Sequence, residues 1–125
     1  MFDVRIINDE AILFEDDIEV KNLEYLRDED GDIKYDFPDG NYVTIDSDND
    51  IEWCDSDDRE HRDGDMPSTI RAGGNITYCK HGKIHRECGP ATSTKRQQYW
   101  LNHNTYDKNG YIDVLNANYG IIAHV

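Results

Sequence analysis

The sequence predicts an all-β, mainly antiparallel protein, built as a twisted sheet of stacked β-hairpins with one short helix at most. Three observations predict it. The aliphatic residues are β-biased, with 13 Ile and five Val against five Leu and five Ala. The apolar runs are short and are separated by turn signals such as His81-Gly82 and Asn109-Gly110. Segments of the second half repeat at 21 to 25 residues, a length that suits one hairpin per repeat.

Residues 1–43 show no clear copy of the repeat and predict an acidic N-terminal cap. Within this segment, residues 2–7, 11–14 and 33–37 have the β-branched and aromatic composition of strands. Residues 20–26 fit either a strand or a short helix. A segment of this kind would cover the open end of a hairpin array.

Residues 44–112 predict a set of degenerate hairpin repeats. Residues 78–90 align without gaps with residues 99–111. An upstream copy matches Thr69-Ile70, Ile76 and Tyr78 with Thr44-Ile45, Ile51 and Trp53, and His85-Arg86 with His61-Arg62. Hairpins cannot bury their faces alone, so neighbouring copies should stack into one sheet. We expect residues 113–125 to add a C-terminal strand to a single compact domain.

The best-preserved copy, residues 78–91, resembles a short repeat of the form aromatic-x-x-Asn-Gly-Lys-x-His-Arg-Glu-Asp-Gly-Pro-Ala. That repeat recurs in small proteins of tailed phages and giant viruses and is loosely similar to MORN hairpin repeats. Here His81 stands in place of Asn and Cys88 in place of Asp. The similarity covers about residues 44–112. It implies a viral origin and a β-hairpin array, and it implies no catalytic residue.

Charge is divided unevenly along the chain. Residues 1–65 hold 24 of the 27 acidic residues and carry a net charge of −18, whereas residues 66–125 carry +4. The first 65 residues also contain 23 apolar residues, so we expect an acidic folded surface rather than a disordered tail. Such a surface repels nucleic acids and anionic lipids and attracts basic surfaces.

Several classes of protein are disfavoured. No apolar stretch approaches the roughly 20 residues of a membrane span, and the N-terminus lacks the order of a signal peptide. Three cysteines argue against a disulfide framework. We therefore expect a soluble protein of the host cytoplasm. Neither a nucleotide-binding loop nor a nucleophile elbow is present, and the Cys54–His61 pair is a weak signal, so we expect no enzyme and no cofactor.

Two clusters have the residue types of a metal site. Cys79, His81, His85 and Cys88 lie within ten residues and form a potential zinc ligand set, but they lack the usual Cys-x2–4-Cys spacing. Residues 46–50 begin like a calcium loop, but Ile51 occupies the position where that loop needs Gly. We expect no metal, with the Cys/His group as the alternative.

The leading hypothesis is a virus-encoded inhibitor whose acidic surface mimics nucleic-acid phosphates. It would block a basic host defence protein such as a nuclease, a restriction enzyme or a CRISPR effector. Alternate residues of a β-strand project from the same face. A strand over this segment would therefore place four acids on one face: Asp46, Asp48, Asp50 and Glu52. The candidate partner-binding acids are Glu15, Asp16, Asp17, Glu19, Asp28, Glu29, Asp30, Asp46, Asp48, Asp50, Glu52, Asp55, Asp57, Asp58 and Glu60. The candidate interface aromatics are Tyr25, Tyr35, Tyr42 and Trp53.

Two alternatives remain open at this point. The protein could be a structural or adaptor repeat protein that binds a partner through its Tyr-rich C-terminal hairpins. It could also form a homodimer. Direct binding of nucleic acid or of a membrane is not expected, because the acidic half repels both.

Overall fold

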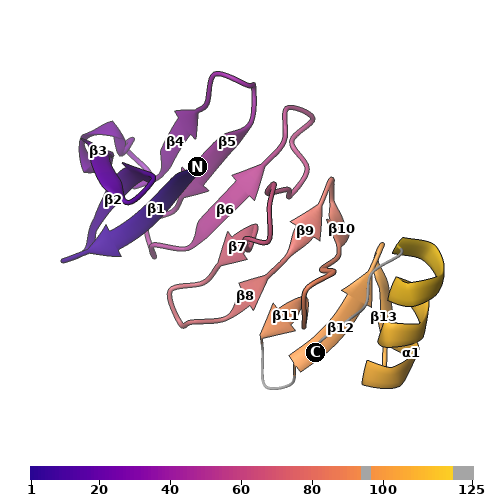
Figure 1. Cartoon of the computed structure of the whole chain (residues 1–125). Coiled ribbons are helices and arrows are strands. Elements are labelled where there is room, and N and C mark those ends of the chain that lie inside the picture. Colours follow the sequence, from indigo (N-terminus) through magenta and orange to yellow (C-terminus); the bar gives the residue numbers. More distant parts are fainter. Residues whose placement is uncertain (94–96, 120–125) are drawn as a thin grey trace.

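The computed structural model describes residues 1–93 and 97–119 and has an open, mainly antiparallel β architecture (Figure 1). A three-stranded sheet lies at the N-terminal end, a large eight-stranded sheet forms the body, and one short α-helix packs at the C-terminal end. The prediction of a mainly antiparallel β protein is confirmed. No helix of the described residues is long and apolar enough to cross a membrane.

The N-terminal sheet is a meander of three strands joined by two-residue turns. Its strands are β1 (Phe2–Ile7), β2 (Glu10–Glu15) and β3 (Ile18–Asn22), in that order. Asn8-Asp9 and Asp16-Asp17 form the turns, and all four residues have positive φ. Short polar side chains tolerate this conformation, which explains why Asn and Asp occupy these positions. After β3, the ambiguous segment becomes a single 3-10 turn, Glu24–Leu26.

The large sheet follows the chain from one edge to the other, with one interruption. Its strands are β4 (Ile33–Asp36), β5 (Tyr42–Ile45), β6 (Ile51–Cys54), β7 (Thr69–Ile70), β8 (Ile76–Thr77), β11 (Thr92–Ser93), β12 (Gln97–Leu101) and β13 (Asn104–Tyr106). The order in space is β13-β12-β11-β8-β7-β6-β5-β4. The hairpin of β9 (Cys79–Lys80) and β10 (Lys83–Ile84) leaves the sheet between β8 and β11.

A five-residue turn recurs along the acidic half. Turns of this kind begin at Asp28, Phe37, Asp46 and Asp55, nine residues apart, and a four-residue strand follows each of the first three. In each turn the first residue donates its N–H to the carbonyl of the fifth, and the fourth residue has positive φ. The nine-residue units continue across residue 43, and β4 belongs to the large sheet. The expected boundary of a cap at residues 1–43 is therefore wrong.

The main core lies between the N-terminal sheet and strands β4 to β6. Isoleucines pair across five neighbouring strands to form one continuous row, Ile33, Ile45, Ile51, Ile70 and Ile76. Val4, Ala11 and Leu13 of the N-terminal sheet pack in the same buried cluster. The Phe37 ring stacks on Trp53 with centroids 5.3 Å apart. These side chains fill the interior that the N-terminal sheet closes.

Two histidines connect successive hairpins in the middle of the molecule. His61 accepts the backbone N–H of His81 on Nδ1 at 3.0 Å, and His85 accepts that of Asn102 at 2.8 Å. His81 and Asn102 are the first residues of the two following hairpin turns. Each histidine is buried, and its Nε2 meets the carboxylate two residues further on. The two hairpins therefore dock through the same contact.

The arginine after each histidine also repeats its contacts. Arg62 lies over the ring of Trp53 at 3.9 Å, and Arg86 lies over the ring of Tyr78 at 4.0 Å. Each guanidinium also donates to a proline carbonyl, of Pro67 or Pro90 respectively. The pairing of a guanidinium with an aromatic face and a carbonyl explains the His-Arg…Pro pattern of the sequence. Membership of a MORN-like family stays a prediction.

Residues 108–119 are helical, whereas we expected a strand from residue 113 onward. Helix α1 (Lys108–Val114) is followed by a π-helical turn, Leu115–Tyr119, so the strand prediction is wrong for residues 113–119. Residues 120–125 lie outside the described part of the chain. Asp107 caps the helix by accepting the N–H of Gly110. Tyr111 and Leu115 lie one turn apart and form a second core with Leu101.

Candidate partner-binding surface

Two of the five-residue turns lie side by side at one end of the large sheet. Arg27 joins them, because its guanidinium donates to the carbonyls of Gly31 and Asp46 and to the side chain of Asn49, at 2.6 to 2.9 Å. The N-terminal sheet adds Asp9, which lines the same cavity as Asp48. We call the acids of this end the acidic turn surface: Asp9, Asp28, Glu29, Asp30, Asp32, Asp46, Asp48 and Asp50.

The carboxylates of the acidic turn surface divide into two groups. Asp28 and Asp46 fold back on their own turns, each accepting two backbone N–H groups at 2.9 to 3.0 Å. Asp50 accepts the N–H of Ala72 at 2.7 Å. The other five are exposed and make no ion pair with the described residues: Asp9, Glu29, Asp30, Asp32 and Asp48. These five carry charge that a partner can reach.

The acidic turn surface corrects the expected strand arrangement. Asp46, Asp48 and Asp50 do not project from one face of a strand, because residues 46–50 form a turn and only Glu52 lies on β6. The backbone of the turn reverses too sharply for alternate residues to share a face. Sequence reasoning had also missed Asp9 and Asp32. Their signal was the recurrence of acidic turn residues, at Asn8-Asp9 and in the first nine-residue unit.

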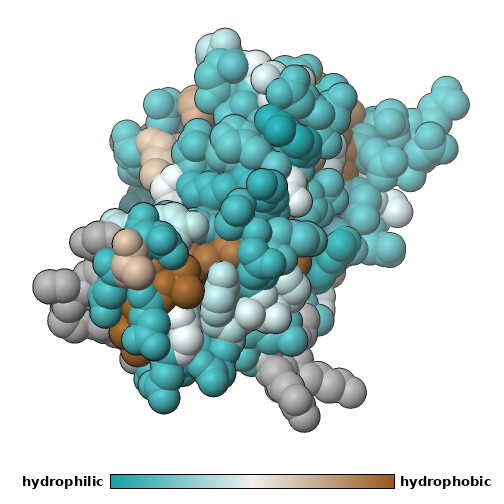
Figure 2. Space-filling model, turned by 90° about the vertical axis from the view of Figure 1, so that its right-hand side faces the viewer, coloured by the Kyte–Doolittle hydropathy of each residue, from teal (hydrophilic) through white to brown (hydrophobic). Residues whose placement is uncertain are grey.

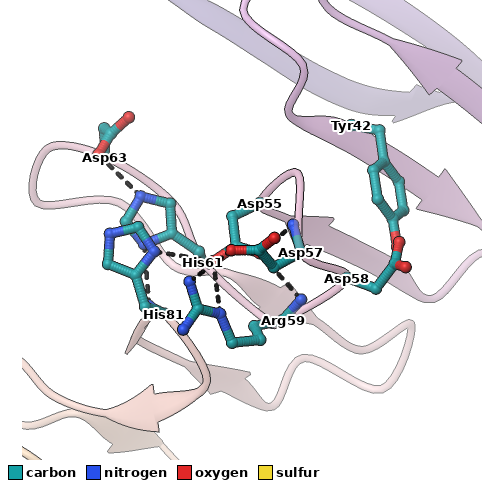
Figure 3. Close-up of polar contacts among 8 residues, drawn as sticks. All are labelled: Tyr42, Asp55, Asp57, Asp58, Arg59, His61, Asp63 and His81. Carbon is teal, nitrogen blue, oxygen red and sulfur yellow. Dashed lines mark hydrogen bonds and ion pairs between the residues drawn. The ribbon is translucent and has the colours of Figure 1, made fainter.

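At the opposite end of the sheet, the turn at residues 55–59 holds a satisfied polar network (Figure 3). Asp55 is buried and accepts the N–H groups of Asp57 and Arg59, the Arg59 Nε–H, and a bond with His81 Nδ1 at 2.8 Å. Burial alone would raise the pKa of Asp55, but the bonds from His81 and from the two backbone groups hold it well below its usual value. Asp55 is therefore a structural acid, and its place in the predicted binding set is wrong.

The remaining groups of this network also have internal partners. The His61 and His81 rings stack with centroids 3.8 Å apart (Figure 3). The Tyr42 hydroxyl donates to Asp58 at 2.7 Å, and that bond together with burial raises the pKa of Tyr42. Asp57 pairs with Arg59 at 3.1 Å. This end of the sheet consequently presents less uncompensated charge than the acidic turn surface.

The acids of the N-terminal sheet form a separate group. Asp16 pairs with the Met1 ammonium at 2.7 Å, and Asp17 pairs with Arg5 at 2.5 Å. Glu15 and Glu19 are exposed and make no ion pair with the described residues. These four lie on β2, β3 and the turn between them, so the structure does not bring them into the acidic turn surface.

Glu52 and Glu60 face the two buried cysteines. The Cys54 thiol donates to Glu52 at 3.6 Å, and the Cys79 thiol donates to Glu60 at 3.5 Å. Burial raises the pKa of each thiol to about 11. Neither cysteine has the lowered pKa of a nucleophile, and Cys54 has no hydrogen bond to His61. The two glutamates are half-buried and engaged, which removes them from the accessible acids.

The expected interface aromatics lie in different environments. Tyr25 is 65% exposed. Tyr35 packs against the main core, and Tyr42 is bound to Asp58. Trp53 is only 7% exposed, so the prediction that it anchors an interface is wrong: it is a core residue stacked between Phe37 and Arg62. Its indole Nε1 has no hydrogen-bond partner in the described part of the chain.

The Cys/His group does not form a metal site. Cys79 binds Glu60, His81 binds Asp55, His85 binds Asn102, and Cys88 is exposed. Within residues 1–93 and 97–119, no three His, Cys, Asp or Glu side chains are placed to hold a metal ion. The four side chains are separated because Cys79 lies on β9, His81 lies in the turn, and His85 and Cys88 follow β10.

The Tyr-rich C-terminal hairpin is engaged with the helix. Tyr99 and Tyr106 pack with Tyr111 in the second core, and the Tyr111 hydroxyl donates to the Arg86 carbonyl at 2.5 Å. Figure 2 shows that the side of the molecule nearest the C-terminal helix is mostly hydrophilic, with one small hydrophobic strip. The aromatics thus serve mainly to hold the last hairpin to α1.

Comparison with known proteins finds no matching family model, no similar curated protein and no similar solved structure. The fold and the site define an open antiparallel β protein that carries an acidic surface on its turns.

Proposed function

We propose that the protein is a virus-encoded inhibitor whose acidic turn surface imitates the phosphates of a nucleic acid. Its partner would be a host protein with a basic nucleic-acid-binding groove, such as a nuclease, a restriction enzyme or a CRISPR effector. The observation that supports this is the gathering of eight carboxylates from three adjacent segments at one end of the sheet. The viral context comes only from the repeat resemblance of residues 44–112.

The inhibition would be steric and electrostatic. Five carboxylates of the surface are exposed and not paired with described residues, so lysine and arginine side chains of a basic groove can bind them. The net charge of −14 would accelerate association and would repel competing nucleic acid. Both effects weaken as salt rises.

The turns are ordered before a partner arrives. The Asp28 and Asp46 carboxylates close their own turns, and Arg27 joins the two. A surface that is already ordered loses little conformational entropy on binding. The same bonds keep the free acids in a fixed array rather than on a mobile tail.

The partner can be sought by capture from a bacterial host lysate on the immobilised protein, with elution by a salt gradient. A captured protein should be released as salt rises, and duplex DNA or RNA should compete for it. A complex that resists salt, or that nucleic acid does not displace, would contradict the proposal.

Matched variants then locate the surface. Glu29→Gln with Asp48→Asn removes two free charges of the acidic turn surface. Asp36→Asn with Asp113→Asn removes two exposed charges elsewhere. We expect the first pair to weaken binding of the captured partner by roughly tenfold and the second by less than about twofold. Equal losses would mean that net charge alone, and not this surface, determines binding.

A further inference from the structure

A cavity of about 320 Å³ lies between the turn of the β9–β10 hairpin and the turn of the β12–β13 hairpin. It is lined by Arg59, Lys80, His81, Lys83, His85, Asn102 and Tyr119. Three of these residues are lysine or arginine, and no carboxylate of the described residues lines the cavity. The two histidines are each held by an acid, His81 by Asp55 and His85 by Glu87. In a chain with a net charge of −14, this concentration of one sign of charge is unexpected.

The positive charge of the cavity is only partly compensated. The Arg59 guanidinium forms ion pairs with Asp55 and Asp57. The Lys80 ammonium donates to the carbonyls of Arg62 and Gly64 at 3.2 and 3.3 Å. It makes no ion pair with the described residues, and its charge contributes to the lowered pKa of Asp65. Lys83 is exposed and makes no ion pair with the described residues. A cleft lined by one sign of charge focuses the field on its opening.

Neutral donors complete the walls. Asn102 supplies a side-chain amide, and Tyr119 a hydroxyl. Burial raises the pKa of Tyr119, so its phenol keeps its proton at neutral pH. The two turns are held in place, because Gly82 donates to the Glu60 carbonyl and His103 donates to the Ile84 carbonyl. The lining residues of these two turns therefore stand on a hydrogen-bonded backbone.

We propose that this cavity binds a small phosphate-bearing anion. Phosphate is a compact anion that accepts hydrogen bonds from several directions, and both lysine and arginine side chains bind it well. A small anion that enters the cavity interacts with the local cations within the Debye length of about 8 Å at physiological salt. A long polyanion would also meet the acidic half of the chain, so nucleic acid is excluded. The phosphate could be free or belong to a small phosphate ester.

The test is a titration of the isotope-labelled protein, followed by NMR at constant ionic strength. The probes are inorganic phosphate, ribose 5-phosphate and a single-stranded DNA oligonucleotide. We expect saturable amide shifts at His81, Lys83 and Asn102, with a dissociation constant on the order of 1 mM for the tighter small anion. Tighter binding of ribose 5-phosphate would identify an ester ligand, and equal or tighter binding of inorganic phosphate would identify the free ion. Saturable binding of the oligonucleotide at the same amides would overturn the proposal.

A matched pair of variants separates the cavity from general charge. Lys83→Gln removes a lining cation, and Lys108→Gln removes an exposed one that does not line the cavity. We expect Lys83→Gln to weaken binding about fivefold to tenfold, and Lys108→Gln by less than about twofold. Equal weakening, or shifts that never saturate, would overturn the assignment. The outcome does not depend on the acidic turn surface or on its partner.

Discussion

Three aspartates in this chain use their charge to shape the backbone. Asp28, Asp46 and Asp55 each begin a five-residue turn, and each accepts two N–H groups of that turn on one carboxylate oxygen. Bonds to an ionised acceptor are stronger than bonds between neutral groups. Among the acids that follow within the turns, Glu29, Asp30, Asp32 and Asp48 are exposed and make no ion pair with the described residues, whereas Asp50, Asp57 and Asp58 have internal partners. Neighbouring acids in the sequence thus have different roles.

Asp55 gives the clearest prediction at this scale. Its pKa in the folded protein is lowered, so its contribution to stability is full above the unfolded value of about 3.9 and is lost as pH falls further. We expect Asp55→Asn to lower the unfolding free energy by about 2–4 kcal/mol at pH 7, because it removes a buried, fully bonded carboxylate. The difference between variant and wild type should shrink at pH 3. Urea unfolding at the two pH values measures both effects.

The neighbour Asp57 provides the control for Asp55. It is exposed, and its one partner, Arg59, is half-exposed. Asp57→Asn should change the unfolding free energy by less than about 1 kcal/mol at pH 7. Equal effects of the two substitutions would contradict the structural role of Asp55.

Residue roles were predictable from the sequence only in part. The number of acids and their concentration in the first half can be read from the sequence. The exposure of acids such as Glu29 and Asp48 could also be predicted from it. Which carboxylates fold inward depends on the turn type, and that depends on the positive φ at the fourth residue of each turn. Trp53 was predicted to anchor an interface, because an aromatic residue next to acids in the sequence is compatible with either an interface or a core. Only the packing of Phe37 and Arg62 against it decides.

Among the elements, the hairpins of the second half depend on buried histidine acceptors. His85 accepts the Asn102 N–H, and replacement by Leu would leave that donor without its partner. We expect His85→Leu to lower the unfolding free energy by about 1–3 kcal/mol and to accelerate amide exchange at Asn102. Chemical denaturation and hydrogen exchange measure the two effects.

His85→Gln is the matched variant, because a glutamine side chain retains an acceptor. It should recover part of the loss and part of the amide protection at Asn102. Faster exchange in both variants to the same degree would show that His85 acts through volume and not through its hydrogen bond.

Strands and turns were predicted correctly where the local sequence signals were strong. Hairpins were predictable where turn residues with positive φ interrupt β-branched runs, as at His81-Gly82. The strand expected over residues 113–125 had no turn or alternation signal of its own. The signals for a helix were the Asp107 cap and the spacing of Tyr111, Val114 and Leu115. Packing of that apolar stripe on β12 and β13 overrides the weak propensities of Ile112 and Val114.

At the scale of the whole molecule, the concentration of charge opposes compaction. Residues 1–65 carry −18, and most of these charges lie at the surface. We expect the melting temperature to rise by a few degrees between about 10 and 300 mM sodium chloride, because salt screens the repulsion. Thermal melts followed by circular dichroism measure this rise.

The double variant Glu29→Gln with Asp48→Asn should already be more stable at low salt, and its melting temperature should rise less with salt. A melting temperature of the wild type that falls over this range of salt would show that ion pairs, and not repulsion, dominate the electrostatic free energy.

The global topology lay beyond local sequence reasoning. The hairpin of β9 and β10 leaves the large sheet, and β8 then pairs directly with β11. The N-terminal sheet covers only one part of the large sheet, over β4 to β6. Both features depend on contacts between residues far apart in the chain, which short-range patterns of turns and apolar residues do not specify.

The nine-residue spacing of the turns limits how this architecture can change in length. Because adjacent strands are antiparallel, inserting one nine-residue unit would reverse every later strand and exchange the two ends of the sheet for all later turns. The turns at Asp28 and Asp46, which lie at the same end, begin eighteen residues apart. Gene duplications that preserve the fold must therefore add units in pairs. Each such pair would extend the row of isoleucines by two strands and would add one more acidic turn beside those already present.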